Sequence, residues 1–159
     1  MTAGMGRTTG GASAEAVFRP DVRLARTFLD SNILVYAEDS AAPVKQKKAI
    51  DLIVEHGSKR TGVVSLQVLG EYFFAATRKI HLDPGTARSQ VEFYSRFHLV
   101  EPTVSDVLAA IDLHRLHRFS YWDSLILQCA IRSGCRVLLS EDMRSGPEFG
   151  GVKIVNPFL

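Results

Sequence analysis

The chain has 159 residues, of which 46% are hydrophobic and 23% are charged, and its formal net charge is +2. This is the composition of one ordinary globular domain, and a chain of this length buries a sizeable core without disulfide staples. No apolar stretch approaches the ~20 residues of a transmembrane helix, so we expect no membrane partner.

The first 26 residues differ from the rest of the chain. They are rich in Gly, Ala, Thr and Arg, show no hydrophobic period and lack the apolar core of a signal peptide. We therefore expect a disordered extension, or sequence upstream of a later start codon such as Met5. Its four arginines and two acids carry the whole excess of +2. Residues 27–159 are neutral by count, so global charge does not favour a nucleic-acid partner.

From residue 26 onward, strand patterns alternate with helix patterns, which predicts an α/β fold. Specifically, we expect a three-layer α/β/α sandwich around a mostly parallel sheet of about five strands. The predicted strands are residues 26–30, 61–65, 98–102, 135–140 and 152–158. The predicted helices are residues 43–57, 65–79, 83–97, 103–119 and 120–134.

Capping residues mark the ends of these helices. The expected N-terminal caps are Asp83, Thr103 or Ser105, and Ser120, and the expected terminal glycines are Gly57 and Gly134. In the helix over 65–79, the spacing predicts that one face enters the core. That face comprises Leu66, Leu69, Phe73 and Ala76.

The two cysteines, Cys129 and Cys135, form neither a metal-binding signature nor a disulfide framework. One falls in an apolar helix pattern and the other just before a strand, so we interpret both as small core residues. Both are compatible with a reducing cytoplasm, where we expect the protein to reside.

Three carboxylates, Asp30, Asp123 and Asp142, stand at the ends of predicted elements, and a fourth, Glu71, lies one and a half turns into the helix over 65–79. Ligand sites in open α/β sheets gather outside the carboxyl ends of the strands, so these side chains can meet there. Four anions at close range repel one another, which calls for a proton or a cation. Carboxylate oxygens suit Mg²⁺ or Mn²⁺.

Each carboxylate also has a purely structural interpretation. Asp123 can serve the N-terminus of a helix, Asp142 can be a turn residue, and Glu71 can be a solvated helix residue. Asp30 is the hardest to explain in this way, because the neighbouring sequence FLDSNIL offers no helix end and no hairpin turn. Four acids at one edge of a sheet favour a site more strongly than any one of them.

Four segments resemble PIN-domain proteins, and specifically the VapC-type ribonuclease toxins of bacterial toxin–antitoxin pairs. They are FLDSNILVYAED, VSLQVLGEYFFAATRK, YWDSLILQCAIRSGCRVLLSEDM and VKIVNPF, and the resemblance covers roughly residues 27–159. The four acids fall at the family's acidic positions: Asp30 in a D-[ST]-N motif, Glu71 on a helix, Asp123 in a YWD-type helix start and Asp142 in a [ST]-x-D turn. The one notable departure is Ser140, where Thr is commoner.

The resemblance implies an endoribonuclease that uses Mg²⁺ or Mn²⁺ to activate a water against an RNA phosphodiester. It implies that Asp30, Asp123 and Asp142 hold one or two metal ions, with Glu71 bound directly or through water, while Asn32 and Ser140 orient these groups. It also implies a homodimer and a cognate antitoxin. The alternative is a noncatalytic PIN-like module that binds RNA or protein, and the complete acidic set argues against it.

Other enzyme classes lack their motifs. A receiver domain usually has adjacent acids after its first strand, and a DxD phosphatase needs Asp where Asn32 stands. Neither a G-x-G-x-x-G nor a G-x-x-x-x-G-K-[ST] motif occurs, which removes the main support for dinucleotide-binding and P-loop proteins.

Because the domain is neutral, RNA binding requires local basic groups. The main candidates are Arg115, Arg118 and Lys79, with Lys45, Lys47, Lys48 and Arg78 as further ones. The alternative for each is a solvated helix face, which we favour for the lysines. His114 and His117 have zinc-ligand spacing, but no third soft ligand follows at suitable spacing.

Overall fold

The structure is a computed structural model that describes residues 25–159. The predicted disordered extension, residues 1–26, falls almost wholly outside this range. At the centre lies one six-stranded sheet with strand order β3-β2-β1-β4-β6-β5. The strands are β1 (Arg26–Leu29), β2 (Gly62–Ser65), β3 (His98–Val100), β4 (Cys135–Leu139), β5 (Glu148–Phe149) and β6 (Val152–Val155).

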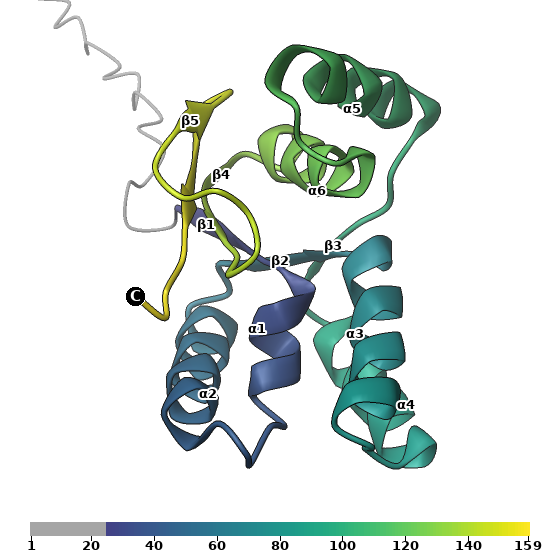
Figure 1. Cartoon of the computed structure of the whole chain (residues 1–159), viewed down its shortest axis with the longest axis vertical. Coiled ribbons are helices and arrows are strands. Elements are labelled where there is room, and N and C mark those ends of the chain that lie inside the picture. Colours follow the sequence, from purple (N-terminus) through teal and green to yellow (C-terminus); the bar gives the residue numbers. More distant parts are fainter. Residues whose placement is uncertain (1–24) are drawn as a thin grey trace, which may run out of the picture.

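Helices cover both faces of the sheet. They are α1 (Ser31–Tyr36), α2 (Pro43–Ser58), α3 (Leu66–Lys79), α4 (Pro84–Tyr94), α5 (Val104–His117) and α6 (Tyr121–Arg132). Figure 1 shows α5 and α6 on one side of the sheet and α1 to α4 on the other. All neighbouring strands pair in parallel except β5 and β6. The predicted mostly parallel three-layer sandwich is confirmed.

The predicted helix caps are largely confirmed. Asp83 and Ser120 accept hydrogen bonds from backbone N–H groups in the first turns of α4 and α6, and Thr103, not Ser105, caps α5. Gly57 does not end α2, which continues to Ser58.

Helix α3 buries a different face from the predicted one. Its buried side chains are Val68, Leu69, Tyr72 and Ala76. Leu69 and Ala76 are buried as predicted, but Leu66 is 49% exposed and Phe73 is 40% exposed. The stripe Val68–Tyr72–Ala76 has a spacing of four residues and packs into the core, where the Tyr72 ring lies 5.3 Å from the ring of Tyr94 on α4.

Two short elements were not predicted. Strand β5 has two residues, too few for an alternation pattern. Helix α1 has six residues and begins directly after β1, with Asp30 as its N-terminal cap. The inference that the FLDSNIL segment contains no helix end is therefore wrong, because one and a half turns of helix are too short to show a period.

Both cysteines lie in the core as predicted, and neither forms a disulfide. Burial raises the pKa of each thiol to about 11, which keeps the sulfur protonated at neutral pH. Within residues 25–159, none of the helices combines the length and the apolar character that crossing a membrane requires.

Candidate active site

Asp30 occupies the point where β1 ends and α1 begins. It is 4% exposed. Its Oδ1 accepts a hydrogen bond of 2.7 Å from the Ser31 backbone N–H, and its Oδ2 accepts one of 2.7 Å from the Ser140 hydroxyl. The Asn32 side-chain amide lies 3.4 Å from the same Oδ2. These neighbours fix the orientation of a carboxylate that is nearly removed from water.

The environment of Asp30 disfavours its charged form. Burial is the largest effect and raises the pKa to about 6 from the ordinary value of 3.8, while hydrogen bonds from Ser140 and Ser31 oppose the rise. The negative charges of Glu71 and Asp123 raise the pKa further. The repulsion expected from converging carboxylates is thus present at this residue.

Glu71 reaches the same region from the second turn of α3. One carboxylate oxygen accepts a hydrogen bond of 3.1 Å from the Ser31 hydroxyl, which also lies 3.5 Å from Asp30. The other oxygen accepts a hydrogen bond of 2.7 Å from the Gln67 amide. The same amide donates to the carbonyl of Trp122 at 3.2 Å. Gln67 therefore ties Glu71 to the first turn of α6.

Asp142 lies just beyond β4 and is joined to Asp30 through Asn32. The Asn32 amide nitrogen lies 3.3 Å from Asp142 Oδ2 and 3.5 Å from the Ser140 hydroxyl. The side-chain oxygen of Asn32, Oδ1, accepts a hydrogen bond of 3.2 Å from the Glu141 backbone N–H. One side chain on α1 thus holds the turn after β4 against the end of β1.

Asp123 stands in the first turn of α6, where its backbone N–H donates to the Ser120 hydroxyl at 3.0 Å. The cap uses the backbone of Asp123 and not its carboxylate. No hydrogen bond to that carboxylate occurs within residues 25–159. A carboxylate at a helix N-terminus is stabilised by the helix dipole, so the structural and functional interpretations of Asp123 are compatible.

The four acids share one edge of the sheet without forming a preassembled metal cage. Among the described residues, no three His, Cys, Asp or Glu side chains are arranged to hold one metal ion. The donor chemistry nevertheless fits a hard cation, because the groups are carboxylate, hydroxyl and amide oxygens with an excess of negative charge. Hydrogen bonds from Ser31, Asn32 and Gln67 orient three of these carboxylates.

Sequence reasoning missed two residues of this network, Ser31 and Gln67. Ser31 is the middle residue of the Asp-Ser-Asn motif, and its hydroxyl connects Asp30 to Glu71. Gln67 precedes Glu71 by four residues, so the two share a helix face, and this spacing was the available signal.

The basic candidates have different surroundings. Lys79 lines a pocket of about 290 Å³ together with Ser31, Asn32 and Asp142. Lys45 pairs with Glu141 and lies 4.7 Å from the centre of the Tyr36 ring. Lys47 pairs with Asp51 on its own helix, as expected for a solvated face.

The end of α5 holds the other basic candidates. Arg115 lies 3.9 Å from Asp112, and Arg118 ends α5 in a left-handed conformation with φ 60°. His114 contacts the Phe119 carbonyl at 2.6 Å, and the His117 ring packs against Phe149. The two histidines therefore have packing and hydrogen-bonding partners, and within the described range no metal cluster includes them.

The fold and this site define an α/β protein with carboxylates gathered at the carboxyl edge of a mostly parallel sheet. The sequence model of the PIN domain matches residues 27–145, and the chain belongs to the PIN domain family. The prediction made from the four sequence segments is confirmed at this level.

Two solved structures share the fold. VapC20 of Mycobacterium tuberculosis, a sarcin–ricin loop cleaving toxin, is 16% identical with a TM-score of 0.60, over 70% of this chain and 86% of that one. VapBC2 of Rickettsia felis, bound to a promoter DNA fragment, is 17% identical with a TM-score of 0.56, over 82% of this chain and 97% of that one. No curated protein sequence matches the chain.

Proposed function

We propose that the protein is a Mg²⁺- or Mn²⁺-dependent endoribonuclease and the toxin of a toxin–antitoxin pair. The observation that carries the proposal is the hydrogen-bonded group formed by Asp30, Glu71 and Asp142 through Ser31 and Asn32. Asp30 also carries a pKa raised first by burial and then by its acidic neighbours, which is typical of a functional carboxylate. Membership of the PIN domain family supports nuclease activity.

Asp30, Asp123 and Asp142, together with Glu71, would hold the divalent ion. A bound ion supplies a water of lowered pKa and offsets the charge that develops on the phosphate. Ser140 and Asn32 keep Asp30 and Asp142 in place, and Ser31 and Gln67 do the same for Glu71. Lys79, at the edge of the adjacent pocket, contributes a positive charge for an RNA phosphate.

The two structural neighbours support the finer parts of the proposal. VapC20 is a toxin that cleaves the sarcin–ricin loop, which supports a nuclease activity of this kind here. VapBC2 supports a cognate antitoxin, which we expect to cover the acidic group with a basic segment, because Arg pairs well with carboxylates. We further propose a homodimer in the cytoplasm, where reduced buried thiols such as Cys129 are stable.

The test is cleavage of RNA by the purified protein with Mn²⁺ and with EDTA. We expect Asp30→Asn to lower the metal-dependent rate at least roughly hundredfold, because it removes a metal-binding charge. Asn is as good an N-terminal cap as Asp, so α1 persists. Asp112→Asn, an exposed change on α5, is the matched control and should retain activity.

Two outcomes distinguish this proposal from the noncatalytic alternative. Full cleavage by a folded Asp30→Asn variant would contradict the assignment of the site. RNA binding by the parent without any metal-dependent cleavage would favour a noncatalytic PIN-like module.

A further inference from the structure

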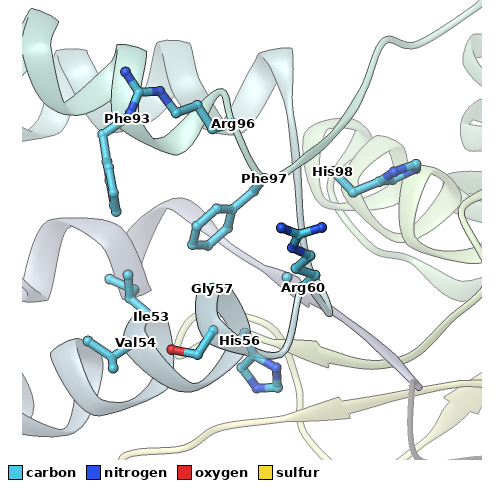
Figure 2. A pocket seen from close by; sticks show the side chains of 11 residues that line it. Ile53, Val54, His56, Gly57, Arg60, Phe93, Arg96, Phe97 and His98 are labelled. Atoms are coloured by element: carbon cyan, nitrogen blue, oxygen red, sulfur yellow. The ribbon is translucent and has the colours of Figure 1, made fainter.

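A second hollow lies at the opposite edge of the sheet from the acidic group, where β2 and β3 begin. It has a volume of about 830 Å³ and opens between the ends of α2 and α4 (Figure 2). This volume falls in the range of small-molecule sites. None of the four carboxylates contributes to it. The hollow, which we call the α2–α4 pocket, is therefore separate from the candidate active site.

The walls of the α2–α4 pocket are apolar and aromatic. Figure 2 shows Phe93 and Phe97 on the α4 side facing Ile53 and Val54 on α2. The ring centres of the two phenylalanines are 6.2 Å apart. A Cβ placed on Gly62 would approach the Phe97 ring to 2.9 Å, so the ring rests directly on the backbone of β2. Phe93 remains 46% exposed, so its ring is available to a ligand.

The charges of the α2–α4 pocket are of one sign. Arg60 and Arg96 line it, and no Asp or Glu does. Within residues 25–159 neither arginine forms an ion pair, whereas Glu55 and Glu92 pair with Lys59 at 2.6 Å and Arg88 at 3.8 Å. Neither Arg60 nor Arg96 is therefore neutralised by an ion pair with a described residue.

Arg60 also adopts an unfavourable backbone conformation. Its φ is 54°, in the left-handed region, at the position after a helix where glycine is usual. Cations at helix C-termini interact well with the helix dipole, but Lys59 already provides that charge at the end of α2. Arg60 thus places a long cationic side chain at the pocket wall, at a position where glycine would be unstrained.

We propose that the α2–α4 pocket binds a nucleotide, with the base against Phe93 and Phe97 and the phosphate held by Arg60; Figure 2 shows the Arg96 guanidinium beyond Phe93, where it adds positive charge at the rim. Guanidinium groups match phosphate oxygens in geometry and charge, and bases stack on aromatic side chains. A simple anion would leave the aromatic wall unused, and a purely apolar peptide would leave the arginines unused. The proposal does not depend on ribonuclease activity, since it concerns the other edge of the sheet.

The test is calorimetric titration of the whole chain in EDTA with adenosine monophosphate, adenosine and inorganic phosphate as separate probes. EDTA keeps divalent ions from drawing phosphate to the acidic group. We expect adenosine monophosphate to bind at least tenfold more tightly than adenosine or inorganic phosphate. Equal affinity for inorganic phosphate, or no binding of the monophosphate, would overturn the proposal.

Arg60→Gly is the decisive variant, because glycine suits the left-handed conformation and the fold should not weaken. We expect affinity for the monophosphate to fall tenfold or more while the melting temperature stays level or rises. His81→Gly is the matched control, since His81 has the same φ of 54° but does not line the pocket. Unchanged affinity in Arg60→Gly would overturn the proposal.

Two further measurements locate the contacts and the source of the nucleotide. Phe93→Ala should lower the affinity of the monophosphate towards that of phosphate alone, and an unchanged affinity would overturn the stacking role. A short oligoadenylate that binds more tightly than the monophosphate, with the gain lost in Arg60→Gly, identifies a nucleotide within a strand. Equal affinity identifies a free nucleotide.

Discussion

At the scale of single residues, Asp30 combines two roles that have opposite effects on stability. As the cap of α1, it satisfies a backbone N–H at the end of β1. As a buried carboxylate near Glu71 and Asp123, it is costly to ionise. Sequence reasoning identified the charge and its edge location but missed the cap, because a six-residue helix has no visible period.

The raised pKa of Asp30 gives a pH-dependent prediction for the metal-free protein. The folded value is about 6 and the ordinary value is 3.8, so the folded state binds the proton more tightly. The protonated Asp30 carboxyl therefore adds to the free energy of unfolding below pH 3.8, and this contribution is lost as pH rises through 6. The expected loss is about 3 kcal/mol in the free energy of unfolding.

The Asn side chain in Asp30→Asn cannot ionise, so the free energy of unfolding of this variant does not fall between pH 3.8 and 6 for this reason. In EDTA we expect the variant and the parent to melt at similar temperatures near pH 4, and the variant to melt several degrees higher at pH 7.5. Thermal melts at both pH values measure the difference. Parallel pH profiles for the two proteins would show that Asp30 titrates normally in the folded state.

At the scale of elements, α3 contributes both Glu71 and an apolar face that the monomer leaves uncovered. Leu66 and Phe73, expected in the core, are 49% and 40% exposed, and Gly70 between them has open space around it. The residues at 66, 70 and 73 follow one helix face. This stripe is a suitable surface for the proposed homodimer.

We predict that Phe73→Glu converts the dimer to a monomer, because it places a charge in an apolar interface. Light scattering of the purified chain measures the change. Val44→Glu on α2, at an even more exposed apolar position, is the control and should remain dimeric. If both Phe73→Glu and Leu66→Glu remain dimeric, the dimer interface does not lie on this face of α3.

Sequence patterns predicted the long elements and most short strands, including β3 with three residues, and missed α1 and β5. The caps Asp83, Thr103 and Ser120 and the long strand β4 have strong local signals, and the structure contains all of them. Element β5 carries too few residues to produce a pattern. The orientation of α3 depends on its packing against α1, α4 and β2, which no local pattern contains.

At the scale of the whole molecule, the parallel sheet explains how distant acids converge. Strands β1, β2 and β4 are parallel neighbours, so Asp30, the α3 helix and the turn with Asp142 start from the same edge. Sequence order and strand ends suffice to predict this grouping. The hydrogen bonds made by Ser31 and Gln67 arise from side-chain positions in three dimensions, and sequence alone did not specify them.

In the proposed function, the four carboxylates act together on a divalent ion. The most direct measurement is the melting temperature in EDTA and then in rising Mn²⁺, for the parent, Asp123→Asn and the control Asp112→Asn. An ion at one hundred times its Kd stabilises the folded state by about 2.7 kcal/mol, which is a rise of roughly 5–10 °C. We expect Mn²⁺ to act at lower concentration than Mg²⁺, since it tolerates less regular oxygen geometry.

Asp123→Asn should lose most of this rise, because it removes a ligand and leaves Ser120 to cap α6, while Asp112→Asn should keep it. If the parent shows no rise at millimolar Mn²⁺, or if parent and Asp123→Asn rise equally, the four carboxylates do not hold the ion together.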